Sequence, residues 1–199
     1  MWTLAQYQDW FRKEYSESPD PSWPSDQNGA VWTHDRLSTV VHSFHPSPEL
    51  TKSGAAVFEK AACNKCHKRG SGGAAAGPDL TTLGWRKQKE EILVDLLYPS
   101  HDLHEEYPTV SVVLKGGRVF SGLLQPGADG SLASVNSRAE RQEFPKADVE
   151  SMTPQRVSSM PAGTLDTLSE TEIQQLFAFL TSVEGIPRPH AEPAGDTEE

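Results

Sequence analysis

The sequence has few cysteines, an excess of acidic over basic residues, and no long apolar run. With only 2 cysteines it has no second CxxC pair, and it has no HxxxH pair, which argues against a four-ligand structural zinc site. The formal net charge of -10 argues against a nucleic-acid or anionic-membrane surface and favours a basic or mixed-charge partner. No apolar run reaches the roughly 18 residues that a transmembrane helix needs. The hydrophobic fraction of 36% is low for one compact globule of 199 residues, so exposed arms and tails are expected.

Both cysteines lie in one short motif that ends in a histidine. The motif consists of Cys63, Asn64, Lys65, Cys66 and His67. Two cysteines three positions apart with histidine directly after the second form the attachment pattern for c-type haem. Each thiol adds to one vinyl group of the porphyrin, and the histidine reaches the iron. The motif therefore predicts one covalently bound haem c with His67 as an axial ligand of the iron.

Other uses of a CxxC pair fit the surroundings less well. A thioredoxin-type redox pair follows a strand and opens a helix. Here residues 53–62 have a helical pattern, and residues 69–73 after the motif form a glycine-rich loop. A plain disulfide would leave His67 without a role.

Helical patterns flank the motif on both sides. Residues 4–15, 33–43, 48–62 and 87–97 are predicted to be helical, with the proline-rich residues 18–24 as an extended linker and Pro99 ending the last of these helices. Gly54 and Phe58 share one helical face, so a second helix is expected to approach closely at Gly54, with Phe58 beside it. The pattern returns after Ser169, which forms a predicted capping box with Glu172.

The segment between the last two predicted helices alternates with the period of β-strands. Residues 110–114 and 119–124 flank a Gly-Gly turn and predict a hairpin. Residues 131–135 and 141–144 extend the pattern. We therefore predict a compact antiparallel unit of about four or five strands.

The order of these features resembles the class I cytochrome c fold, and more narrowly the haem-binding cytochrome c domain of Planctomycetes and Verrucomicrobia. The matching positions are Gly54 with Phe58, Cys63 to His67, Gly77 to Leu80, Tyr98 to Ser100, Gly116 with Gly117, Met160 to Gly163, Leu165 to Leu168, and Leu176 to Leu180. The resemblance implies a mainly α fold around one haem, with an inserted small antiparallel β unit and an N-terminal helical arm. The expected divisions are an arm or linker at 1–47, a cytochrome domain at 48–185 with the β unit at 107–150, and a disordered acidic tail at 186–199.

The resemblance also implies further haem contacts. Met160 matches the family's sixth iron ligand, the Pro78 carbonyl is expected to accept a hydrogen bond from His67, and Trp85 and Arg86 are expected at the haem edge and a propionate. Alternatives stay open: Met160 as a packing residue, Met152 as the ligand, or a bis-histidine haem through His101 or His104. For the two histidines, exposure to solvent is the favoured interpretation.

The function implied is single-electron transfer with His/Met ligation, in a domain that is not itself an enzyme and accepts electrons from a fused or docked dehydrogenase. One alternative is a haem-based gas sensor or peroxidase-like site with a displaceable sixth ligand. Another is a module that docks a partner through the β unit. Because haem c is attached outside the cytoplasm, we expect a periplasmic or otherwise exported protein. Residues 1–4 lack the features of a signal peptide, so we also expect the chain to be a domain of a longer exported protein.

Overall fold

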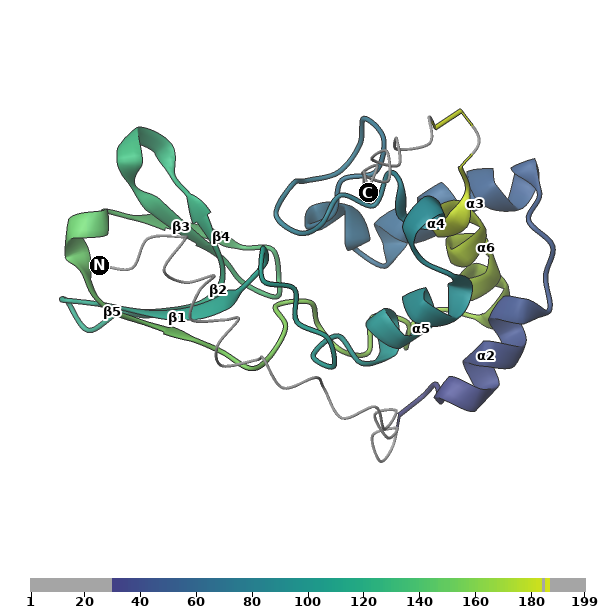
Figure 1. Cartoon of the computed structure of the whole chain (residues 1–199), viewed down its shortest axis with the longest axis horizontal. Helices are drawn as coiled ribbons and strands as arrows, with labels where there is room; N and C mark the ends of the chain where they lie inside the picture. The colour runs from purple at the N-terminus through teal and green to yellow at the C-terminus, as the bar shows by residue number, and fades with distance from the viewer. Residues whose placement is uncertain (1–29, 184, 187–199) are drawn as a thin grey trace, which may run out of the picture.

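The computed structural model describes residues 30–183 and 185–186, which form a helical half and a β-sheet half (Figure 1). The α-helices of this part are α2 (His34–His42), α3 (Pro48–Lys60), α4 (Leu83–Arg86), α5 (Lys89–Leu97) and α6 (Glu170–Thr181). Three short 3-10 turns are η1 (Cys63–Lys65), η2 (Ala128–Gly130) and η3 (Lys146–Asp148). The predicted helix at 4–15 and linker at 18–24 lie outside the described residues, as does nearly all of the predicted tail.

Helix boundaries follow local capping chemistry. The Ser47 side chain accepts a hydrogen bond from the backbone N–H of Leu50, and Pro48 occupies the first turn of α3, where its missing N–H costs nothing. The predicted capping box before α6 is confirmed, because Ser169 and Glu172 each accept a hydrogen bond from the other's backbone N–H. The sequence periods thus located α2, α3, α5 and α6 to within a few residues.

The helical core is organised around the contact between α3 and α6. A Cβ atom at Gly54 would lie 2.1 Å from the carbonyl oxygen of Gln175 and 2.6 Å from Cβ of Phe179, so only glycine permits this approach. The ring of Phe58 packs at 5.5 Å from that of Phe179. The predicted close helix approach at Gly54, with Phe58 beside it, is confirmed.

Helix α2 packs on α5 and α6 and is part of the same core. Leu37 and Val41 on α2 are fully buried. The indole N–H of Trp32, which precedes α2, donates a hydrogen bond to the carbonyl oxygen of Leu165 at 3.0 Å. The described part of the expected N-terminal arm therefore contributes to the helical core.

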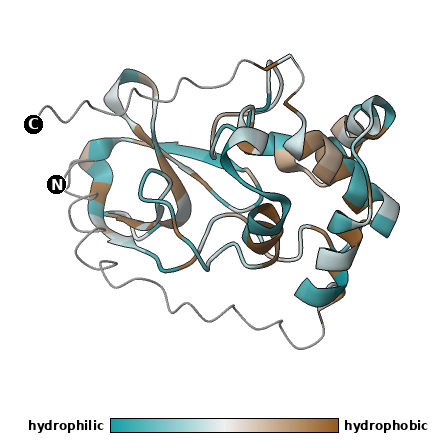
Figure 2. Cartoon of the chain, turned by 45° about the vertical axis from the view of Figure 1, so that its right-hand side comes forward, coloured by the Kyte–Doolittle hydropathy of each residue, from teal (hydrophilic) through white to brown (hydrophobic). Residues whose placement is uncertain are grey.

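The second half is a five-stranded antiparallel sheet in the order β4-β3-β2-β1-β5. Its strands are β1 (Thr109–Leu114), β2 (Val119–Pro126), β3 (Leu132–Val135), β4 (Arg141–Phe144) and β5 (Val149–Pro154). The sheet has a hydrophobic cluster of its own, in which the rings of Phe120 and Phe144 stack at 5.3 Å. Figure 2 shows hydrophobic segments both along the strands and within the helices, as two separate clusters require.

The prediction of a mainly α fold is wrong. The described chain carries a five-stranded sheet beside its five α-helices, and the sheet buries Val110, Val112, Leu114 and Phe144 in a cluster separate from the helical one. A sheet with its own core is a second structural half of the molecule and not a small addition to a helical fold.

The last strand, β5, continues to Pro154. Its sequence has weak alternation and a terminal proline, so only pairing with β1 defines it.

Candidate functional site

The two cysteines are presented by a tight turn directly after α3. Ala62 has a left-handed φ of 59°, which redirects the chain out of the helix. The following turn η1 is closed by hydrogen bonds from the backbone N–H groups of Cys66 and His67 to the Cys63 carbonyl oxygen, at 3.2 and 2.8 Å. Both thiols are free and partly buried. The turn therefore displays two unpaired thiols and the histidine from one short stretch of backbone.

The thiols lack the character of a redox-active pair. Burial raises the pKa of the Cys63 thiol to about 11, and burial also raises the pKa of Cys66 against an opposing effect of Lys65. A dithiol oxidoreductase needs a thiolate nucleophile, which requires a lowered pKa. These surroundings therefore argue against thioredoxin-type chemistry.

The His67 ring is oriented by the backbone of a distant part of the same loop. Its Nδ1 lies 2.9 Å from the carbonyl oxygen of Pro78, as the resemblance implied. A carbonyl can only accept, so Nδ1 carries the proton and Nε2 holds the free lone pair of a neutral imidazole. Burial lowers the pKa of His67, although the Pro78 hydrogen bond opposes this, so the neutral form prevails at pH 7. Among the described residues none hydrogen-bonds to Nε2, which is the state required of a metal-ligating histidine.

The loop backbone fits closely around this ring. A Cβ atom at Gly77 would lie 3.0 Å from Cε1 and 3.2 Å from Nδ1 of His67, so the ring rests against the bare glycine backbone. The backbone N–H groups of Ala76 and Gly77 both donate to the Cys66 carbonyl oxygen, at 3.0 and 2.7 Å. The segment before Pro78 is thereby tied to the motif itself, and the acceptor for Nδ1 is held in place.

Arg69 is a structural residue of the site that the sequence did not indicate. Its guanidinium donates to the carbonyl oxygens of Phe179 and Ser182 at the end of α6, the latter at 2.9 Å, and lies 4.3 Å from the Phe179 ring centroid. Burial lowers the pKa of Arg69. A cation at these carbonyls is favoured by the partial negative charge at the C-terminal end of a helix. Its partners lie about 110 positions away in the chain, so no local pattern predicts the contact.

Trp85 and Arg86 lie in α4, close to the loop that follows Pro78. The Arg86 guanidinium donates to the carbonyl oxygen of Asp79 at 2.7 Å. Trp85 is 36% exposed. Helix α4 is seated on α6 through Gly84, where a Cβ atom would lie 2.3 Å from the Thr181 carbonyl oxygen. Both predicted residues are therefore on the exposed side of a helix whose other face is packed, next to the loop that orients His67.

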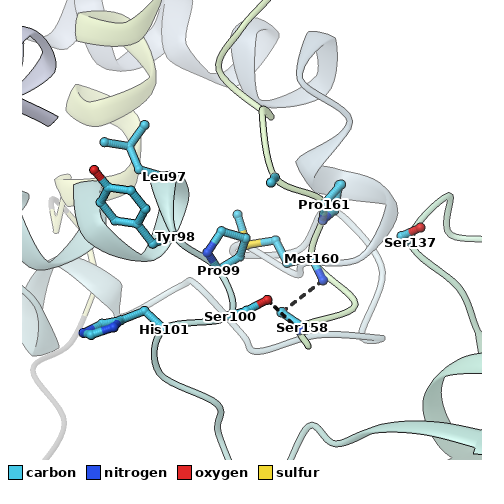
Figure 3. Close-up of a pocket in the computed structure, with 10 residues that line it drawn as sticks. Leu97, Tyr98, Pro99, Ser100, His101, Ser137, Ser158, Met160 and Pro161 are labelled. Carbon is cyan, nitrogen blue, oxygen red and sulfur yellow. Dashed lines mark hydrogen bonds between the residues drawn. The ribbon is translucent and has the colours of Figure 1, made fainter. Parts of the chain in front are cut away.

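Met160 lies in the loop before α6 and is partly buried. It packs against the helical cluster, as do Cys63 and Leu80. Its backbone N–H donates to the Ser158 hydroxyl at 3.1 Å, and the Ser158 N–H donates to the Ser100 hydroxyl at 3.0 Å (Figure 3). These bonds tie the methionine loop to the turn that follows α5.

A cavity of about 520 Å³ opens beside Met160. It is lined by Leu97, Tyr98, Pro99, Ser100, His101, Ser137, Ser158, Met160, Pro161 and Ala162. In Figure 3 the Met160 side chain extends toward Pro99, while the His101 ring lies on the far side of Ser100. The cysteines and His67 are not among these lining residues, so the cavity adjoins the proposed sixth ligand and not the attachment motif.

The rival ligands have different surroundings. Met152 lies on β5 opposite Val112 and packs against the hydrophobic cluster of the sheet. His104 is exposed, and its Nδ1 accepts a hydrogen bond from the Glu106 N–H at 3.3 Å. His101 is partly buried and lines the open cavity beside Met160. Met152 thus has a packing role in the sheet, and His101 is the alternative that lines the same cavity as Met160.

The donor groups fit a haem c. The chain offers two free thiols on one turn, an imidazole with its Nε2 uncommitted, and a thioether on a loop that packs on the same helical core. No group of three or more His, Cys, Asp or Glu side chains able to hold a metal ion occurs among residues 30–183 and 185–186. In the same part of the chain, no helix is long and apolar enough to cross a membrane.

Comparison with known families agrees with this chemistry. Residues 49–98 match the family model of the cytochrome c oxidase, cbb3-type, subunit III. The match begins in α3, includes the attachment motif and Pro78, and ends just after α5; the sheet and Met160 lie beyond it. No curated protein matched the chain. The matched segment supports a c-type cytochrome, and a cytochrome c domain implies haem c and haem-based electron transfer.

Proposed function

We propose that this chain is a monohaem c-type cytochrome domain that relays single electrons, with His67 and Met160 as the axial ligands of the iron. The observation that carries the proposal is the state of His67. Its Nδ1 is committed to the Pro78 carbonyl oxygen at 2.9 Å, its ring is pressed on Gly77, and its Nε2 has no described hydrogen-bond partner. It follows directly on two free cysteines with the spacing of haem attachment.

Position and surroundings support Met160 as the second ligand. It lies in a loop held by Ser158 and Ser100, packs on the same cluster as Cys63, and adjoins a cavity. Its rival Met152 is packed into the sheet. A thioether ligand raises the reduction potential of a haem and suits electron transfer.

In this function, the residues of the chain would attach the haem and keep its histidine ligand in one orientation. Cys63 and Cys66 would attach the group through two thioether bonds, and the Pro78 carbonyl keeps His67 in one orientation and raises its basicity as a ligand. When bound, haem c supplies a centre that changes oxidation state by one electron. If His67 and Met160 both ligate the iron, no iron position would remain for a substrate, which favours a role in electron transfer over one in catalysis.

The partner and the compartment are part of the same proposal. The net charge of -10 favours a basic or mixed-charge docking surface on a fused or docked dehydrogenase, at a rate that falls as salt rises. The chain is assigned to the periplasm or another exported location, because haem c is attached there. The β unit between α5 and Met160 favours the planctomycete and verrucomicrobial type of domain.

The test is a visible spectrum of protein expressed with a haem c maturation system. A pyridine haemochrome assay gives the number of haems per chain, and loss of covalent haem in Cys63→Ala with Cys66→Ala locates the attachment. The oxidised protein should show a weak band at about 695 nm, the signature of methionine ligation. Met160→Ala should remove that band, whereas Met152→Leu, its control on the sheet, should keep it.

Carbon monoxide separates the proposal from a sensor or peroxidase-like site. The ferrous wild type should bind it slowly, because the Met160 thioether must first leave, and Met160→Ala should bind it rapidly. Rapid binding by the wild type, with no band at about 695 nm, would favour the displaceable-ligand alternative. Absence of covalent haem from properly matured protein would refute the proposal.

A further inference from the structure

The sheet contacts both loops that carry the proposed axial ligands. We infer that the β-sheet positions these ligands, through Gln125 on the His67 side and Thr109 on the Met160 side. The inference rests on the proposed function, and it gives the sheet a role at the haem site in addition to any role in docking.

The contact on the His67 side is made by the amide of Gln125 in β2. Its Nε2 donates to the carbonyl oxygens of Ala75 and Ala76, both at 3.2 Å. Its Oε1 accepts from the guanidinium of Arg141 in β4 at 2.9 Å. Arg141 can only donate, so it fixes which end of the amide faces the loop. The sheet thus presents two N–H donors to the backbone immediately before Gly77.

A shift of the Ala75–Ala76 segment would move the His67 ring. Gly77 lies in contact with the ring, and the next residue, Pro78, provides the acceptor for Nδ1. The Ala76 N–H is bonded to Cys66, so the loop is held from the motif on one side and from the sheet on the other. The two carbonyl groups that Gln125 binds thus belong to residues three and two positions before Pro78, whose carbonyl orients the ligand.

The contact on the Met160 side is made by the hydroxyl of Thr109, the first residue of β1. Thr109 is only 7% exposed, and its Oγ1 lies 2.8 Å from the hydroxyl oxygen of Ser159, the residue before Met160. A buried threonine hydroxyl carries a desolvation cost that this hydrogen bond offsets. The Thr109 carbonyl oxygen also accepts from the N–H of Gln155, which leads into the same loop, at 2.9 Å.

The two contacts come from the same end of one strand pair. Thr109 in β1 pairs with Leu123 in β2, and Gln125 lies two residues further along β2. Gln125 itself pairs with Ala133 of β3, so the β1–β2 and β2–β3 pairings join the two contacts within one sheet. The sheet therefore links the Ala75–Ala76 segment to Ser159 through side chains on adjacent strands.

The test uses two neutral substitutions and two matched controls in haem-loaded full-length protein. Thr109→Val removes the hydroxyl that bonds to Ser159 and Gln125→Met removes the amide that donates to the loop, both with little change in volume. Thr153→Val on β5 and Gln142→Met on β4 make the same changes at exposed sheet positions. All four should keep a cooperative thermal transition. The measured quantities are backbone amide hydrogen exchange, the pH at which the band at about 695 nm disappears, and the rate of carbon monoxide binding.

Thr109→Val is expected to speed carbon monoxide binding and exchange of the Met160 N–H about fivefold or more, and to lower the pH at which the band is lost. Thr109→Ser should restore all three. Gln125→Met should speed exchange at Ala76 and Gly77 by a similar factor and shift the reduction potential. Both controls should match wild type within about twofold.

Wild-type exchange and carbon monoxide binding in Thr109→Val, together with wild-type exchange in Gln125→Met, would overturn the inference while leaving the proposed function intact. If Met160→Ala keeps the band, the ligand assignment itself fails, and the inference fails with it. A Thr109→Val effect that Thr109→Ser does not reverse would mark a packing role only and would also count against it.

Discussion

His67 donates from Nδ1 to the Pro78 carbonyl oxygen across 2.9 Å, and the ring lies in contact with the backbone of Gly77. The two residues that hold the histidine thus follow it by about ten positions in the same loop. The end of a largely exposed glycine-rich segment thus holds the His67 side chain in one orientation. It also explains why the small residues before Pro78 matter: a larger side chain at Gly77 would occupy the volume of the ring.

Gly77→Ala should impair haem incorporation. The new Cβ atom would lie 3.0 Å from Cε1 of His67, so either the ring or the loop must move and the Pro78 hydrogen bond must lengthen. The ratio of haem absorbance to protein after maturation should fall severalfold, and the reduction potential of the remaining holoprotein should change. Gly116→Ala is the control, since nothing lies within 4 Å of its added Cβ atom. Full haem content and an unchanged potential in Gly77→Ala would contradict this account.

Gly54→Ala should destabilise the helical half without touching the haem motif. The added Cβ atom would lie 2.1 Å from the Gln175 carbonyl oxygen, which forces α3 and α6 apart. Overpacking of this kind costs about 1–3 kcal/mol of unfolding free energy. Urea denaturation followed by circular dichroism measures it, with Ser53→Ala at the neighbouring exposed position as the control. Equal midpoints for the two variants would show that the interface tolerates separation.

Arg69→Met should cost about 1.5–3 kcal/mol of stability, because it removes charge-assisted hydrogen bonds to the carbonyl oxygens at the end of α6. Chemical denaturation should show the loss, and limited proteolysis should show earlier cleavage in the loop after His67. Arg138→Met provides the comparison for loss of an exposed guanidinium, which here pairs with Glu140. If both variants lose equally little, the guanidinium is not a tie between the motif loop and α6.

Glu172 should contribute to acid sensitivity. The hydrogen bond from Lys60, together with the backbone N–H of Ser169, lowers the pKa of Glu172 from 4.5 to about 2. A folded-state pKa below the ordinary value means that folding favours the ionised form, so the contribution is complete above pH 4.5 and is lost as the pH falls through 2.

The measurement is the urea midpoint of wild type and Glu172→Gln from pH 7 downward. The wild type should be more stable at pH 7, and the gap should close as the pH falls below the ordinary carboxyl value. Glu59→Gln on α3 controls for removal of an exposed carboxylate. A gap that stays constant with pH would mean that Glu172 acts through its capping hydrogen bonds and not through its charge.

Local chemistry was sufficient to predict much of the helical half. The Ser169–Glu172 capping box and the helical periods of α2, α3, α5 and α6 are determined by neighbours in the chain, and so is the CxxCH turn. Gly54 could be predicted to accept a helix because glycine on an apolar helical face has few other uses. The prediction of the fold class was wrong because it depends on contacts between residues far apart in the chain. Alternation located most strands, but whether they form a small addition or a sheet with its own core depends on pairing partners distant in sequence, as β5 shows.

The attachment motif, the histidine that follows it, and the positions of most helices could be predicted from the sequence, since each depends on residue types at short spacing. The groups that surround the motif are brought there by the folding of the whole chain. The binding of Arg69 to the end of α6, the placement of Met152 in the sheet core, and the contacts of Gln125 and Thr109 with the two loops all join residues far apart in the chain. Such contacts depend on three-dimensional packing, for which one sequence carries no periodic signal.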